Sequence, residues 1–367
     1  MVTNHDFQYL GTDIFTRLEQ VTFTSPQNDY FNLTSGEGYA FWSRNYNVIA
    51  KTNTAINRYE NQISWSDSRL DEKAYGIAQA KALRAFAYFN LAQNYGGMVL
   101  ETEEPLSIRS DYTRSSEEET YALIISDLES AIPALQTSPE TGRFSKRAAQ
   151  HLLAEVYLTR AYTSFGSSGD FTTAAALAEE AIGSYDIRSQ SFAQVFDISN
   201  QENDEVLFAV QWGTEGTAED QGNNKHSLFM NQVFEYPGIN RISTPYAVSG
   251  YSAMPTPYFY SLFADNDTRE EATIHRVLYA DGDDVFGTDN IVAGDTVGYY
   301  PKNALDPAEL EDKLNRYYVY QPDQYVFGLP DNIPGTVSHS SSNRVRAKFP
   351  IFKKFVGVIF DEGCYGS

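Results

Sequence analysis

The sequence predicts a mainly α-helical protein, with stacked helix pairs in its first half and a loop-rich second half that contains a few short strands. Between residues 39 and 185, apolar residues recur at steps of three and four, as in helices with one buried face. Beyond residue 187 this period stops, and Gly, Asn, Pro and Tyr dominate. We therefore divide the chain into a loop-rich segment (1–38), a helical region (39–187) and an irregular region (188–367).

The first helix is expected from residue 39 to residue 63. Trp42 falls at core spacing within it, so packing is a simpler role for this ring than ligand stacking. The whole buried stripe consists of residues at helical spacing, namely Trp42, Tyr46, Ile49, Asn53 and Ile56.

The second helix, from Glu72 to the Gly96-Gly97 pair, is the element against which the others are expected to pack. Small residues dominate one of its apolar stripes, so a partner helix can approach it closely. The two glycines provide a left-handed end. The stripes are Ala78, Ala82, Ala85, Phe89 and Ala92, and beside them Leu83, Ala87 and Leu91.

Three further helices are expected before residue 187. One begins after Ser116, which can form a capping box with Glu119. The other two fall within residues 143–162 and 171–186 and are joined by a turn at residues 165–170. Two antiparallel helices with small residues at their contact form the unit of a helical repeat.

The second half of the chain has little periodicity. Residues 205–212 alternate like a short strand, and residues 276–281 suggest another. A short helix is expected to open at Thr256. A long stretch without regular structure in a compact protein is usually a functional surface.

Composition excludes some classes of partner and of structure. The 49 acidic and 27 basic residues give a formal net charge of -22, which argues against nucleic acid or anionic lipid as a ligand because both require a basic surface. No apolar run approaches the length of a membrane span. The single cysteine, Cys364, cannot form a disulfide within the chain.

Short motifs occur in one order from about residue 40 to residue 350. They are Trp42-x3-Tyr46-x2-Ile49-x3-Asn53, Leu83-Arg84-Ala85 leading to Tyr95-Gly96-Gly97, Tyr121 with Asp127-Leu128-x2-Ala131, Lys146 with Ala148-Ala149, Leu153-Ala154-x2-Tyr157-Leu158, Glu205-Val206-Leu207-Phe208, Pro255-Thr256, Asp267-x-Arg269 and Lys348-Phe349. In this order they resemble the SusD/RagB family of outer-membrane nutrient-binding lipoproteins of Bacteroidetes.

The resemblance implies a SusD-like stack of tetratricopeptide-like helix pairs and an irregular region that forms much of the ligand surface. It implies non-catalytic binding of glycans at the cell surface and delivery to a TonB-dependent transporter of the SusC type. Two departures are visible: the lipid-modified cysteine of the family and its C-terminal helical pair are both missing from the sequence. We therefore expect a native chain that is longer at both ends and is anchored in the outer membrane by lipid.

A glycan site needs flat exposed aromatic rings for the apolar faces of sugars and polar side chains for their hydroxyl groups. Three stretches and one further tryptophan have this mixture, and packing inside the protein is the alternative for each. The candidate residues are Asn28, Asp29, Tyr30 and Phe31 in a polar loop, Trp65 between two helices, Trp212 at the end of a probable strand, and Tyr236, Asn240, Arg241 and Tyr246.

Catalysis and metal binding have little support. The five histidines are scattered, and neither a paired Cys/His spacing nor a Gly-rich phosphate loop occurs, so no metal site and no cofactor are expected. A glycosidase would need a pair of carboxylates in a recognisable motif, which the sequence does not offer. Two alternatives to glycan binding stay open: a helical scaffold whose ligand is another protein and, with less support, a glycoside hydrolase.

Overall fold

The computed structural model describes residues 13–16, 36–107, 110–210, 236, 238–239, 254–282, 291–322, 326–327, 347–348 and 351–352. These residues form two compact units. The helical unit contains the described residues from 36 to 189 and from 202 to 210, and the second unit contains the others. Within the described residues, no helix is both long enough and apolar enough to cross a bilayer.

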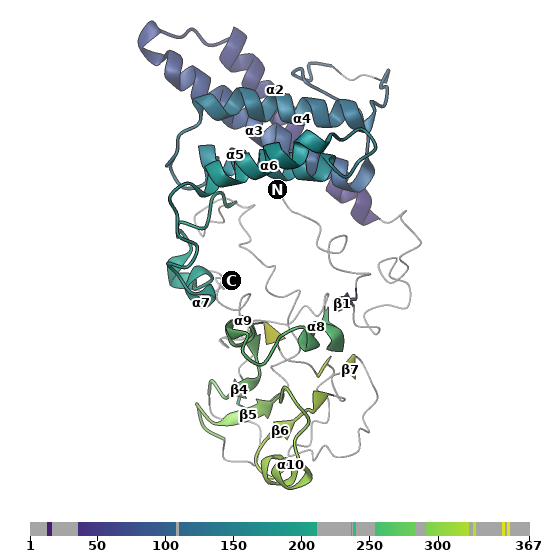
Figure 1. The fold of residues 1–367 in the computed structure, drawn as a ribbon, viewed down its shortest axis with the longest axis vertical. Coiled ribbons are helices and arrows are strands. Elements are labelled where there is room, and N and C mark those ends of the chain that lie inside the picture. The colour runs from purple at the N-terminus through teal and green to yellow at the C-terminus, as the bar shows by residue number, and fades with distance from the viewer. Residues whose placement is uncertain are drawn as a thin grey trace. The chain divides into compact units, whose positions relative to one another are not determined.

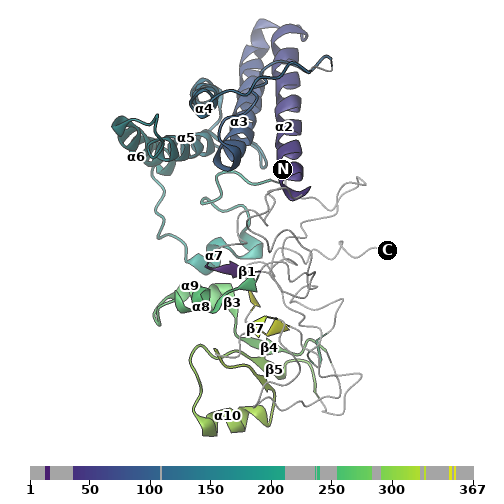
Figure 2. The same cartoon turned by 90° about the vertical axis from the view of Figure 1, so that its right-hand side faces the viewer.

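The helical unit is built from helices that each pack against the next one along the chain, as Figures 1 and 2 show. This arrangement confirms the predicted mainly α-helical stack of tetratricopeptide-like pairs. In chain order its elements are α2 (Gly36–Asn61), η2 (Asp67–Arg69), α3 (Leu70–Tyr95), α4 (Glu117–Ala131), η3 (Ile132–Ala134), α5 (Lys146–Arg160) and α6 (Ser168–Ile182).

Helix α3 lies between α2 and α4 and is buried on both sides, as its two apolar stripes predict (Figure 2). The alanines of its small-residue stripe are almost completely inaccessible to solvent. Trp42 on α2 stacks on Tyr46 with ring centroids 4.7 Å apart and meets Tyr95 of α3 edge-on at 5.0 Å, so its role in the described structure is packing.

A buried ion pair joins α3 to α4. Arg84 on α3 donates from Nε and Nη2 to the two carboxylate oxygens of Asp127 on α4, both at 2.7 Å. The two side chains are only 6% and 4% exposed. A bidentate pair of this kind fixes orientation as well as distance, so it sets how the two helices pack.

The same guanidinium group also binds α2. Arg84 Nη1 donates to Asn53 Oδ1 at 2.8 Å, and Asn53 Nδ2 donates to the carbonyl oxygen of Glu101 at 2.9 Å. The Tyr88 hydroxyl donates to that carbonyl and accepts from the Glu101 amide. One polar network therefore connects α2, α3, α4 and the connector after α3.

The ends of the helices follow the predicted signals. Ser116 and Glu119 form the expected capping box at the start of α4. Helix α3 ends at Gly96, whose φ of 67° is accessible to glycine at little cost. Helix α6 begins three residues earlier than the sequence indicates, because Ser167 and Asp170 form a second capping box.

The strand predicted at residues 205–212 is wrong for its described part, since residues 205–210 are turns and irregular backbone. The carbonyl oxygen of Leu207 accepts a hydrogen bond from the Ser145 hydroxyl at 3.0 Å. The Phe208 ring stacks on Phe144 with centroids 4.3 Å apart. Phe208 therefore packs on other aromatic residues of the helical unit, and the segment forms no strand.

The second unit combines short helices with very short strands. Strands β4 (Val277–Tyr279), β5 (Thr296–Tyr299) and β6 (Tyr318–Val319) form a three-stranded sheet in which β4 and β5 are antiparallel and β5 and β6 are parallel. Three two-stranded pairs, β1 with β2, β3 with β9 and β7 with β8, are antiparallel. The predicted strand near residues 276–281 and the helix capped by Thr256 are both present. The elements are β1 (Phe15–Thr16), α7 (Phe192–Val195), η4 (Ile198–Asn200), β2 (Met254–Pro255), α8 (Pro257–Ser261), α9 (Thr268–Thr273), β3 (Ile274–His275), β4 (Val277–Tyr279), β5 (Thr296–Tyr299), α10 (Pro307–Leu314), β6 (Tyr318–Val319), β7 (Val326–Phe327), β8 (Ala347–Lys348) and β9 (Ile351–Phe352).

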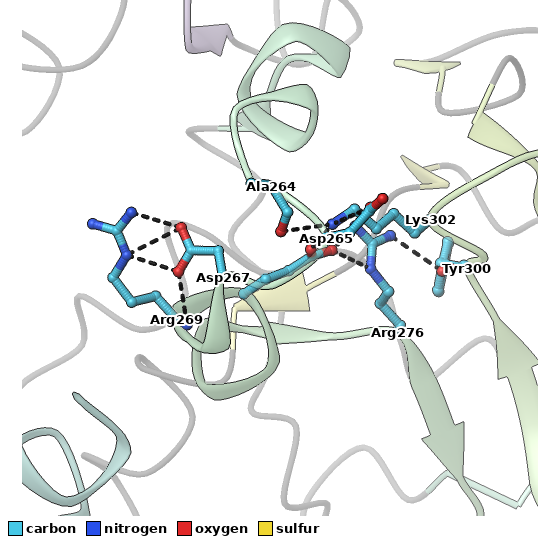
Figure 3. A network of polar contacts seen from close by, with 8 residues as sticks. Ala264, Asp265, Asp267, Arg269, Arg276, Tyr300 and Lys302 are labelled. Carbon is cyan, nitrogen blue, oxygen red and sulfur yellow. Dashed lines mark hydrogen bonds and ion pairs between the residues drawn. The ribbon is translucent and has the colours of Figure 1, made fainter. Parts of the chain in front are cut away.

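A charged network holds α9 to the chain around it (Figure 3). Glu270 on α9 accepts hydrogen bonds from Arg276 and, at 2.6 Å, from Lys302. Arg276 also donates to the carbonyl oxygen of Tyr300 at 3.2 Å. At the start of α9, the Arg269 guanidinium beside Asp267 lowers the pKa of that carboxyl to about 2. Each of these charges is compensated by a neighbour, so the network stabilises the local fold.

We predict that Arg84→Met lowers the free energy of unfolding of the helical unit by about 3–5 kcal/mol, because it leaves the Asp127 carboxylate buried without its cation. Arg188→Met is the matched control, since Arg188 pairs with Asp186 at an exposed position, where an ion pair contributes about 0–1 kcal/mol. Urea unfolding followed by far-ultraviolet circular dichroism measures both. Equal losses in the two variants would contradict the role given to Arg84.

Alkaline pH provides a second test. Desolvation, with the Glu117 carboxylate adding to it, raises the pKa of Tyr121 to about 12, above its ordinary value of 10. The folded state then holds its proton more tightly than the unfolded state, so the stabilisation is present below pH 10 and is lost as pH rises from 10 to 12. Tyr121→Phe should therefore resemble the parent chain at pH 7 and exceed its unfolding free energy by about 1 kcal/mol at pH 11. A difference that does not change with pH would contradict this.

A candidate ligand groove in the helical unit

A groove of about 900 Å³ lies on the helical unit, which places it in the usual size range of small-molecule sites. Helices α2 and α3 contribute most of its lining residues, and the connection between them, the loop before α5 and the segment at 208–210 contribute the rest. We name it the Trp65 groove. Its lining residues are Val48, Lys51, Thr52, Ala55, Tyr59, Trp65, Arg69, Glu72, Tyr75, Gly76, Gln79, Ala80, Leu83, Thr141, Gly142, Arg143, Phe208 and Val210.

Trp65 is half-buried in this groove, and its position is fixed from two directions. Its indole N–H donates to the carbonyl oxygen of Tyr59 at 2.8 Å, near the end of α2. The rings of Tyr59 and Trp65 are in contact, with centroids 5.3 Å apart. The Arg69 guanidinium lies 5.3 Å from the Trp65 ring centroid, a cation–π contact. An aromatic side chain held in this way is ordered before any ligand arrives.

Gly76 on α3 makes room for the Tyr59 ring. A Cβ atom at this position would lie 2.1 Å from Cε1 of Tyr59, far inside van der Waals contact. Glycine inside a helix costs about 1 kcal/mol relative to alanine. Here its absence of a side chain allows the ring to lie directly against the helix backbone.

The wall formed by the loop before α5 is attached to α3 through a side-chain amide. Gln79, which is 7% exposed, donates to the carbonyl oxygen of Phe144 at 2.8 Å and accepts from the Phe144 amide at 2.9 Å. Phe208 stacks on Phe144 and so continues this wall. Gly142 in the same loop has a φ of 83°, which a residue with a side chain rarely adopts.

Charge in the groove is unevenly distributed. Glu72 lies 2.6 Å from Arg69, and the hydrogen bond from that guanidinium lowers the pKa of the Glu72 carboxyl. Lys51 and Arg143 are exposed lining residues on two other segments. The groove thus combines aromatic rings with cations and amide or hydroxyl groups, a mixture suited to a flat ligand that carries polar substituents.

The structure describes two of the residues predicted for a glycan site, and they belong to different units. Trp65 lines the groove and belongs to the helical unit. Tyr236 belongs to the second unit and is 2% exposed, with its hydroxyl bonded to Tyr300 and its ring edge-on to Tyr318. Burial raises the pKa of Tyr236 well above its ordinary value. A ring enclosed in this way has no face available for stacking on a ligand. The role of Tyr236 in the described structure is therefore packing. The other predicted residues, Asn28, Asp29, Tyr30, Phe31, Trp212, Asn240, Arg241 and Tyr246, lie outside the described residues.

Sequence reasoning missed most of the groove. Tyr59 and Arg69 flank Trp65 at distances of six and four residues, and Gly76 interrupts an alanine-rich helix, which is a signal of close backbone approach. Arg143 and Phe208 have no signal of this kind, because folding brings them there from distant segments. Among the described residues, no group of three or more His, Cys, Asp or Glu side chains could hold a metal ion.

Comparison with known proteins identifies the class of fold. Residues 2–158 match a SusD-like family model described as "Starch-binding associating with outer membrane". A SusD-like protein of Bacteroides ovatus is 31% identical over 176 residues, which are 47% of this chain and 32% of the relative. The chain thus spans about a third of the length of that curated relative.

Solved structures give the same result. A crystal structure containing a xylogluco-oligosaccharide is 26% identical, with a TM-score of 0.57 over 71% of this chain and 51% of that one. A laminarin-binding SusD-like protein shares the fold, with 22% identity and a TM-score of 0.58 over 74% of this chain and 61% of that one. The fold is that of a SusD-like helical-repeat protein. The match to the SusD-like family model lies in residues 2–158, where many of the ordered motifs also occur.

We predict that Gly76→Ala lowers the free energy of unfolding by about 1–3 kcal/mol despite the higher helix propensity of alanine, because the new methyl group must displace the Tyr59 ring. Gly169→Ala in α6 is the control, since its Cβ would be 3.6 Å from Ser167 Oγ, an ordinary contact. That variant should be neutral or stabilising. Urea unfolding compares the two, and a stabilised Gly76→Ala chain would refute the close packing of Tyr59.

Proposed function

We propose that this chain captures glycans without cleaving them, as the binding component of a nutrient-uptake system. The observation that carries the proposal is the likeness, at 26% identity over 71% of this chain, to a structure that contains a xylogluco-oligosaccharide. The starch-binding description of the matching family model supports the same ligand class. Aromatic rings and polar side chains, the chemistry that glycans require, also meet in the Trp65 groove.

The groove chemistry also supports the non-catalytic part of this proposal. Glycoside hydrolysis uses two carboxyl groups, one of which keeps a proton to give to the leaving group. Among the described residues that line the Trp65 groove, Glu72 is the one carboxylate, and Arg69 lowers its pKa. A carboxyl with a lowered pKa has already lost its proton at neutral pH, so it is unsuited to general-acid catalysis.

The partner and the location are proposed from the family. The membrane phrase in the family description supports a location at the outer membrane. The lipid anchor and the orientation toward the outside of the cell are part of the proposal and come from the resemblance to the SusD/RagB family. Its partner would be a TonB-dependent transporter of the SusC type that receives the glycan. The net charge of -22 argues against nucleic acid as a partner, because nucleic acid requires a basic surface.

A helical scaffold that binds only other proteins is the second candidate. Apolar side chains at both ends of α6 favour it, since Phe171 is 42% exposed and Ile182 is 54% exposed. The end of a helical stack with such residues can accept a further repeat or a partner. The burial of Tyr236 also removes one of the rings proposed for glycan stacking.

The test is a calorimetric and affinity-gel screen of the purified chain against plant, algal and host polysaccharides. We expect binding to at least one polymer, and about tenfold weaker binding when a stacking ring is removed, either by Trp65→Ala in the groove or by Tyr30→Ala, Phe31→Ala or Trp212→Ala. Tyr39→Ala is the matched control, because Tyr39 is an exposed aromatic residue on α2 that does not line the Trp65 groove. A folded chain that binds no polymer would favour the scaffold, and release of reducing ends would favour a hydrolase.

A further inference from the structure

The Trp65 groove carries positive charge on a strongly acidic protein. Three cations line it, Lys51 from α2, Arg69 from η2 and Arg143 from the loop before α5, whereas Glu72 is the one acid among its described lining residues. Glu72 is paired with Arg69. Within the described part of the chain, no carboxylate lies within ion-pair distance of Lys51 or Arg143.

The positive charges of Lys51 and Arg143 are opposite in sign to the net charge of the chain. A formal net charge of -22 repels anions on average, and its long-range part is screened beyond about 10 Å at physiological salt. Two cations that line one groove can still attract an anion at short range. Carboxylate and sulfate groups are bound by Arg and Lys through charge-assisted hydrogen bonds.

The rings of the groove define the rest of the ligand. Trp65 and Tyr59 are held in contact with each other, and Tyr75 lines the same groove from α3. Such rings suit the apolar C–H face of a sugar. Thr141, an exposed residue that also lines the groove, offers its hydroxyl group to the hydroxyls of such a sugar. A volume of about 900 Å³ accommodates a small ligand of this kind.

We propose that the Trp65 groove binds an anionic saccharide, one that bears a carboxylate or a sulfate, with Lys51 and Arg143 on the acidic group and the Trp65–Tyr59 pair beside the ring. The inference rests on the proposed glycan-binding function and adds to it a charge class and a place of binding in the helical unit.

The experiment compares ligands that differ only in charge. Isothermal titration calorimetry on the full chain uses oligogalacturonate against its methyl ester, and oligosaccharides of a sulfated galactan against their desulfated forms. We expect the acidic form of at least one pair to bind, its neutral form to bind at least tenfold more weakly, and the affinity to fall as salt is raised. The arm that binds shows whether carboxylate or sulfate is the group recognised.

Three variants locate the site. Lys51→Met and Arg143→Met should each weaken binding of the acid about tenfold or more, the loss expected for one charge-assisted hydrogen bond. Both residues are exposed, so the fold should survive their replacement. Arg44→Met is the control, since Arg44 is an exposed cation on the same helix but does not line the groove, and it should leave the affinity unchanged.

The outcomes separate this inference from the proposed function. A chain that binds neutral glycans but no acidic one, or binds an acidic one equally well after Lys51→Met and Arg143→Met, overturns the inference and leaves glycan capture in place. A folded chain that binds neither charged nor neutral glycans overturns both. Acid-selective binding that either groove variant weakens, with Arg44→Met unchanged, supports both.

Discussion

The helical unit depends on one buried cation. Arg84 reaches Asp127 on α4 with two hydrogen bonds and Asn53 on α2 with a third, so a single side chain on α3 orients both of its neighbours. Removing a guanidinium group from water costs several kcal/mol unless its donors are satisfied and its charge is paired. That condition is met only when all three helices are in place, so the ion pair discriminates against other helix packings as well as stabilising this one.

The alanine stripe of α3 and this ion pair act together. Small side chains let α2 and α4 approach α3 closely, and such close approach alone would tolerate sliding of one helix along another. The bidentate bond to Asp127 and the bond to Asn53 specify one register. Because Asn53 also binds the carbonyl oxygen of Glu101, the connector after α3 is fixed by the same set of contacts.

The sequence was most informative where the signal is local. Helical spacing, the Ser116–Glu119 capping box and the glycine end of α3 were all readable within a few residues, and the structure has each of them. Contacts between distant segments could not be read in this way. Arg84 and Asp127, which form the ion pair, are 43 residues apart in the sequence. The hydroxyl of the buried Tyr236 shares a hydrogen bond with that of Tyr300, 64 residues further on. The alternation at residues 205–210 suggested a strand, but the Phe208 ring packs on Phe144, 64 residues earlier, a contact that local spacing does not show.

The Trp65 groove is also built by contacts between distant segments, and its structure indicates which residues would determine ligand specificity. Its walls are placed by contacts that are complete without any ligand, such as Gln79 with the Phe144 backbone and Tyr59 against Gly76. A binding surface ordered beforehand loses little entropy when a ligand arrives, so weak individual contacts can suffice. Lys51 and Arg143, in contrast, are exposed and take no part in holding the walls. The chain can therefore exchange these side chains for others, and with them the charge of the ligand it accepts, without disturbing the helix packing that forms the groove.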